Sequence, residues 1–198
     1  AGGTTFNLGT YTQTVGSLTN KGNISLTSGK LGVEGGDFSN QGSVTLTSGS
    51  LNTGSGLFTN QGVLDLGSGT LNISGGGTSS GTLSGNGKLN ITAGSLAVTS
   101  ANSGLTGNTT INQGASLTLN DQGTLGTSAI NVGGDLNLNA SQTLANVLSG
   151  NGTVTTDSAI TLTGANSFTG SHVIDDAASL TVSSAKNLGL DQGSIASV

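Results

Sequence analysis

The residues best suited to chemistry lie near the carboxyl end of the chain, where the only histidine precedes two aspartates. His172, Asp175 and Asp176 could together suggest an acid–base or metal site. Metal sites usually take several His or Cys ligands at fixed spacing, and this sequence lacks such a pattern. Adjacent aspartates on a strand point to opposite faces, so they cannot act as a glycosidase pair without a bend. We interpret His172 as the replacement of a threonine at an outward-facing position of a repeat.

Other enzyme signatures are equally weak. The sequence "GTSSG" at 77–81 fits the G-x-S-x-G pattern, but we expect it in a polar loop, without the strand-to-helix turn that exposes a nucleophile. Polysaccharide lyases and hydrolases need basic residues or clustered carboxylates, whereas the nine acidic residues are spread along a chain without arginine. Tandem calcium-binding repeats are also missing. The sequence therefore predicts a non-catalytic protein with no metal and no cofactor.

The composition narrows the class of protein further. The 198 residues include 36 glycines, and only 7% of residues are charged, against about 25% in an average domain. Disorder is not expected, because 32% of residues are hydrophobic and they are regularly patterned. Four lysines are the only basic residues, too few for binding to nucleic acid or an anionic membrane. The sequence contains no apolar run of membrane-spanning length and no signal peptide. Because it starts without Met and stops at the strand-like "IASV", we expect a fragment of a longer polypeptide.

A sequence repeat of 20 residues, which we call the phrase, occurs three times in direct succession over 18–77. Asparagine, glycine and leucine return at fixed positions, as Asn20, Asn40 and Asn60 show. Within each phrase apolar residues alternate with polar ones, which is typical of half-buried strands. Several short strands repeated in frame predict an all-β parallel β-solenoid with about 20 residues per coil. Like residues would then stack, so we expect an amide ladder through the three asparagines and stacked rings at Phe38 and Phe58.

The frame changes after residue 77. We align 87–98 with 62–73, which leaves an insertion in the "GGGTSSG" region as an expected surface loop. A longer unit then occurs twice, at 83–126 and at 148–189. Both copies open with "LSGNG", contain "ANS" and close with "LG". We expect all of 1–198 to form a single β-helix segment, with positive-φ glycines at its corners.

The second copy resembles the passenger-associated transport repeat of bacterial autotransporters. Residues 148–189 carry "LSGNGTV", "ITLTGANSFTG" and "SLTVSSAKNLG", while the copy at 83–126 has "LAVTSAN" where the family has "LTLTGAN". The segment 1–80 resembles the repeats of filamentous haemagglutinin. Both resemblances imply a right-handed parallel β-helix exported to the bacterial surface. They also imply a signal peptide before this segment and an outer-membrane barrel after it.

On this basis we expect an adhesive passenger segment at the bacterial cell surface, or secreted. Its partners would be copies on neighbouring cells, or a host surface protein or glycan, bound through stacked Thr, Asn and Ser groups. A passive stalk that displays another effector domain is the main alternative, and a polysaccharide lyase is a weaker one. An ice-binding solenoid would need a regular Thr-x-Thr array. Thr45 and Thr47 fit it, but Asp65 and Gly67 interrupt it one coil later.

Overall fold

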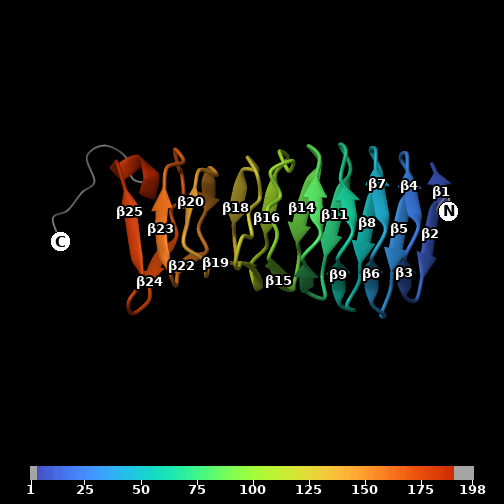
Figure 1. Ribbon diagram of the computed structural model, residues 1–198, viewed down its shortest axis with the longest axis horizontal. Coiled ribbons are helices and arrows are strands. Elements are labelled where there is room, and N and C mark those ends of the chain that lie inside the picture. Colours follow the sequence, from blue (N-terminus) through green and yellow to red (C-terminus); the bar gives the residue numbers. More distant parts are fainter. Residues whose placement is uncertain (1–3, 190–198) are drawn as a thin grey trace.

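The computed structural model of the chain describes residues 4–189 and shows a parallel β-solenoid, which confirms the predicted fold class (Figure 1). Equivalent strands lie about 19 residues apart and the chain makes about nine turns. The only helical element among the described residues is the short 3-10 helix η1 (Ala185–Leu188). With roughly 4.8 Å between neighbouring strands, a face of nine strands is about 40 Å long.

Three β-sheet faces, each built of parallel strands, surround the core. Face 1 consists of β1 (Thr5–Gly9), β4 (Asn23–Leu26), β7 (Ser43–Leu46), β10 (Val63–Asp65) and β13 (Thr82–Ser84). Face 2 consists of β2 (Thr12–Val15), β5 (Lys30–Val33), β8 (Ser50–Thr53), β11 (Thr70–Ile73), β14 (Lys88–Ile91), β16 (Thr109–Ile111), β18 (Ile130–Val132) and β21 (Leu148–Gly150). Face 3 consists of β3 (Leu18–Asn20), β6 (Phe38–Asn40), β9 (Phe58–Asn60), β12 (Gly77–Ser79), β15 (Gly94–Val98), β17 (Ala115–Leu119), β19 (Asp135–Leu138), β22 (Thr153–Thr156) and β24 (Ser171–Ile174).

Face 1 is interrupted between residues 85 and 141, where the chain crosses it twice without forming a strand of a continuous sheet. A separate sheet then takes the same place in the coil, with β20 (Gln142–Leu144), β23 (Ala159–Leu162) and β25 (Ser179–Val182). Only faces 2 and 3 therefore offer sheets that run through most of the described coils.

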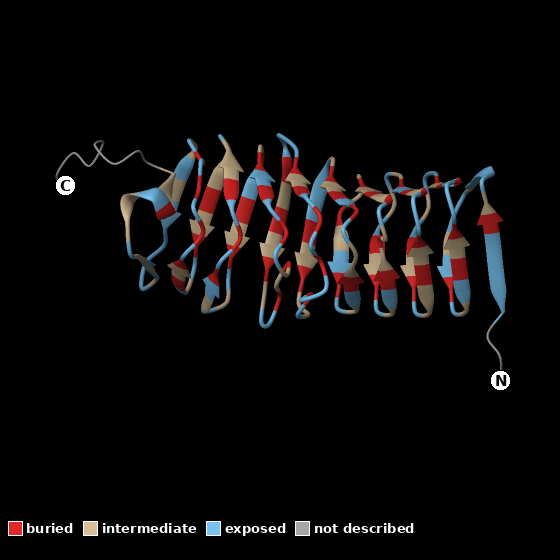
Figure 2. Ribbon diagram, turned by 90° about the horizontal axis from the view of Figure 1, so that it is seen from above, coloured by how far each residue is buried: buried red, intermediate tan, exposed pale blue. Residues whose placement is uncertain are grey.

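The core consists of inward rows of aliphatic residues stacked in register. Leu31, Leu51, Leu71 and Leu89 pair in succession on face 2, and each is at most 1% exposed. Buried and exposed residues alternate along the strands, as the period-two pattern predicts (Figure 2). The rings of Phe38 and Phe58 stack with centroids 5.7 Å apart. Burial of such stacked side chains drives coil formation, because no single coil can cover its own apolar face.

The glycines that mark the recurring phrase have a different role from the one predicted. Gly22, Gly42 and Gly62 are not among the residues with positive φ. Instead, a Cβ on Gly42 would lie 2.1 Å from the carbonyl oxygen of Gly22, and one on Gly62 would lie 2.0 Å from that of Gly42. Close approach of consecutive backbones at this corner, and not a left-handed conformation, therefore requires glycine.

The surface loop predicted around residue 77 is absent, because this segment forms the regular strand β12. Gly77 pairs with Phe58, and Leu89 pairs with Leu71 and not with Leu64, so the alignment of 87–98 with 62–73 was wrong. The coil that contains β12 was not recognised from the sequence, because Gly77 stands where the preceding repeat has Phe58 and Ser79 stands where it has Asn60. Coil length varies from here on, and no single repeat length describes the later coils.

The two copies of the longer unit lie on different faces. Leu83 of the first "LSGNG" belongs to face 1, whereas Leu148 of the second belongs to face 2. The segments "ASLTL" and "ASLTV" are likewise displaced by one face, from β17 on face 3 to β25. The separation between the copies is not a whole number of coils, so the repeated unit returns rotated about the axis.

Candidate contact face

His172 does not occupy the outward position that we predicted from the repeat. It pairs with the fully buried Val154, which pairs in turn with Leu136, so the imidazole continues an inward row of face 3. The ring packs edge-on against Phe168 at a centroid distance of 5.1 Å. Both ring nitrogens are closed to solvent, and neither forms a hydrogen bond with a described residue. Burial lowers the pKa of His172, against a weaker opposing effect of the Leu188 backbone.

We expect the stability of the last coils to fall in mild acid because of this histidine. The unfolded chain binds a proton below about pH 6.5, whereas the desolvated imidazole resists protonation. Stability is therefore unaffected at neutral pH and decreases as the pH falls from 6.5 toward the lowered pKa of the folded state. Thermal unfolding between about pH 7.5 and about pH 5.5 should show this decrease. His172→Leu, which matches the Leu and Val of the same row, should abolish it; an identical pH profile in the variant would contradict this assignment.

The serine of the G-x-S-x-G segment is structural. Ser79 is fully buried on β12, and its hydroxyl accepts a hydrogen bond from the Asn60 side chain at 3.1 Å. The first three residues of the segment form β12, so the loop predicted for this serine was wrong. A hydroxyl without access to solvent, held as an acceptor, cannot serve as a nucleophile.

Asp175 has a partner that sequence reasoning missed. It lies one coil above Asp157, at the end of consecutive strands of face 3, as the bonds from their backbone amides to Thr156 and Leu138 show. Partial desolvation, and then the hydrogen bond and charge of Asp175, raise the pKa of Asp157. The sequence signal for this pair was that Asp157 and Asp175 are separated by the length of one coil. Within residues 4–189, no group of three or more His, Cys, Asp or Glu residues could hold a metal ion.

The asparagines predicted to form a ladder are stacked inside face 3. Asn20 donates through Nδ2 to Oδ1 of Asn40, and Asn40 donates likewise to Asn60, both at 2.8 Å. Each Nδ2 also donates to a backbone carbonyl of the following coil, those of Ser43, Val63 and Thr82. Asn40 and Asn60 are fully buried. The ladder thus joins the first coils from within, as a structural element and not as a binding site.

Further buried asparagines lie at the corners of the later coils, where we made no prediction. Asn102 accepts the backbone N–H of Leu83 at 2.6 Å, and Asn166 accepts that of Leu148 at 2.7 Å. The same contact therefore occurs in both copies of the longer unit, although the copies lie on different faces. The Ala-Asn dipeptides at 101–102, 145–146 and 165–166 were the sequence signal for these positions.

The outward side of face 2 carries a row of neutral positions, interrupted only at Gly32, which has no side chain. Successive strand pairings place one member of the row on each of eight coils: Thr14, Gly32, Asn52, Asn72, Asn90, Thr110, Asn131 and Ser149. Asn90 donates to Asn72 at 2.8 Å, and Asn72 donates to Asn52 at 2.6 Å. This outer ladder presents amides and hydroxyls at the regular spacing of the coils. We call the row the face 2 polar row.

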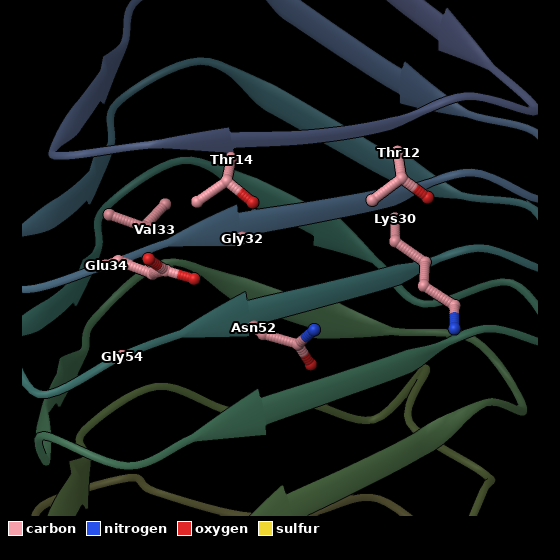
Figure 3. A pocket seen from close by; sticks show the side chains of 8 residues that line it. All are labelled: Thr12, Thr14, Lys30, Gly32, Val33, Glu34, Asn52 and Gly54. Carbon is pink, nitrogen blue, oxygen red and sulfur yellow. The ribbon is translucent and has the colours of Figure 1, made fainter.

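A hollow lies in the face 2 polar row at Gly32. It measures about 180 Å³ and lies between Thr12 and Thr14 of one strand and Asn52 of another, with Lys30 and Glu34 on opposite sides (Figure 3). The floor is the backbone of Gly32, which has no side chain to fill the gap. A second hollow, of about 230 Å³, lies farther along the same face and is lined by Thr110, Asn131 and Ser149 of the row.

The distribution of charge distinguishes faces 2 and 3. Face 3 carries Asp135 at an exposed position, with Asp157 and Asp175 at the ends of later strands. Asp157 and Asp175 are close to one another, and Asp176 follows directly, so this end of face 3 forms a negative patch that would repel a like surface. The face 2 polar row contains no charged residue, and two lysines flank it in the same strands. Face 2 is thus better suited to contact with a second neutral polar surface.

Compared with protein-family models, with curated proteins and with solved structures, the chain matches none of them. No helix in the described part of the chain is long and apolar enough to cross a membrane. The resemblance to autotransporter passengers therefore stays a prediction drawn from the sequence.

Proposed function

We propose that this segment is a non-catalytic, adhesive part of an autotransporter passenger on the bacterial surface. The observation that supports the proposal best is the face 2 polar row, in which seven of eight consecutive coils present a neutral polar side chain in register. The other support is the resemblance of residues 148–189 to passenger-associated repeats. The segment would be anchored to the outer membrane through a domain outside this chain, or be secreted.

The contact would join face 2 of one molecule to the same face on a neighbouring cell. Each hydrogen bond between such rows contributes little, because water is displaced from both partners. Many coils that engage together raise the effective concentration of the remaining contacts. Since the row is uncharged, two copies can approach without strong repulsion. A host surface protein or glycan presenting similar groups could engage the same row.

A passive stalk is the second candidate. The fold itself favours this role, because a stack of coils holds its two ends apart and buries an aliphatic core along its whole length (Figure 1). In that case face 2 would be inert, and another domain would carry the activity.

We expect cell aggregation to decrease in steps as members of the face 2 polar row are replaced. Cells displaying the protein would carry one, two or three of the changes Asn72→Ala, Asn90→Ala and Asn131→Ala. If contacts on separate coils act together, each change should slow settling further, and the triple variant should lose most of the aggregation. Settling of wild-type cells should persist from about 0.1 to about 1 M salt, although the Debye length falls from about 10 to about 3 Å.

The matched control changes the interrupted face 1 at Ser25, Thr45 and Ser84, which also share one outward row. This triple alanine variant, and His172→Leu, should settle like wild type. Equal losses on both faces would contradict a contact through face 2. Displayed protein that never promotes settling or adhesion would favour the stalk.

A further inference from the structure

The outer asparagine ladder ends at the Gly32 hollow with unused donors. Oδ1 of Asn52 accepts from Asn72 at 2.6 Å, while no described residue accepts from Nδ2 of Asn52. Gly32 is the next member of the row and has no side chain to accept this bond. Figure 3 shows the amide nitrogen of Asn52 directed toward the strand that contains Gly32. Because amides in a chain polarise one another, the terminal N–H groups are stronger donors than those of an isolated asparagine.

The remaining groups around the hollow determine which ligand it suits. The Lys30 ammonium donates from one side, the Glu34 carboxylate accepts on the opposite side, and the Thr12 and Thr14 hydroxyls can do both (Figure 3). An anionic ligand would be repelled by Glu34 and a cationic one by Lys30. A neutral ligand bearing several hydroxyl groups meets neither penalty, since each hydroxyl both donates and accepts.

The shape of the hollow agrees with this chemistry. Its volume of about 180 Å³ is smaller than the roughly 300–1,000 Å³ of sites that enclose drug-sized ligands, so it accommodates one small ring. Gly32 and Gly54 expose backbone in its lining, which allows a ring to approach the sheet closely. From this we propose that the Gly32 hollow binds a single neutral sugar ring, with Asn52 Nδ2 and Lys30 donating to ring hydroxyls and Glu34 accepting from one. The site does not require the segment to be an adhesin.

The affinity should be low, because no aromatic ring lines the hollow and all contacts are exposed hydrogen bonds. We expect dissociation constants in the millimolar range. The purified protein would be titrated with the methyl glycosides of glucose, galactose, mannose and N-acetylglucosamine. Two-dimensional NMR should show saturable shifts of the Asn52 side-chain amide and the Gly32 backbone amide with at least one of these sugars.

Gly32→Asn provides the decisive variant. The backbone at Gly32 is not left-handed, and the atoms nearest to an added Cβ belong to the Thr14 side chain, at 3.4 Å or more. The new amide should therefore fold in place, accept from Asn52 and fill the hollow, so sugar affinity should fall at least tenfold. Thr110→Asn adds an amide to the same row four coils away and should leave binding unchanged. Asn52→Ala should also weaken binding and tests the donor independently.

Three results would overturn the site. No saturable shift with any of the four sugars would do so, as would equal shifts in wild type and Gly32→Asn. Shifts at Gly32 and Asn52 that depend on protein concentration without sugar would show that a second copy, and not a sugar, occupies the hollow. None of these results bears on cell settling, so the adhesive role is tested separately.

Discussion

Gly62→Ala is expected to destabilise the protein by about 3 kcal/mol or more. The added methyl group would lie 2.0 Å from the carbonyl oxygen of Gly42 and 2.9 Å from the Gly42 nitrogen. Backbone cannot rotate out of the way as a side chain can, so the two coils must separate at this corner. Overpacking of this kind costs about 1–3 kcal/mol by itself. The separation also weakens the bonds from Gly62 N to Asn40 O and from Val63 N to Gly42 O.

Urea unfolding followed by circular dichroism would measure this loss. Gly16→Ala is the matched control, because a Cβ there meets nothing within 4 Å and the backbone is not left-handed. It should be neutral or stabilising by about 0.4–1 kcal/mol through the unfolded state. Similar unfolding midpoints for the two variants would show that the coils are not in close contact at the glycine corner.

The first coils were predictable because sequence period and structure coincide there. Over 18–77 the constant frame places Leu18, Phe38 and Phe58 in register, and the asparagine ladder follows from that register. Alternation also identified the inward residues of face 1, which are buried as expected. Periodicity is informative when each coil repeats the side chains of its neighbour.

Beyond residue 77 the register of the paired strands cannot be found by comparing the sequences of successive coils. Pairing of Gly77 with Phe58 retains the backbone position but not the side-chain type, so alignment by residue identity chose the wrong coil length. The inward position of His172 follows from its pairing with Val154 and could not be derived from comparison with a threonine repeat. The Gly32 hollow could not be predicted from the sequence, because its prediction needs both the register of the face 2 strands and the direction in which the amides of face 2 donate their hydrogen bonds.

Asn40→Ala is expected to cost about 2–4 kcal/mol, the second large effect. Asn40 is fully buried and makes three side-chain hydrogen bonds: it accepts from Asn20 and donates to Asn60 Oδ1 and to the Val63 carbonyl. Alanine leaves Asn60 Oδ1 without its donor in a site closed to water and removes a bond from Asn20, which retains its bond to the Ser43 carbonyl. Each buried polar group left unsatisfied costs about 1–3 kcal/mol.

The outer ladder supplies the control, because Asn72 also sits between two asparagines and bonds to both. Asn72→Ala breaks bonds of 2.6 and 2.8 Å to Asn52 and Asn90. Those partners lie on the outside of face 2, where water replaces the lost amide, so the cost should stay below about 1 kcal/mol. Lys30→Ala, at an exposed position, should change stability by less than about 0.5 kcal/mol. The denaturation midpoint should therefore be highest for Lys30→Ala, lower for Asn72→Ala and lowest for Asn40→Ala. If the two asparagine variants unfold at the same urea concentration, burial of the inner ladder does not determine its contribution, and the energetic distinction between the two ladders is wrong.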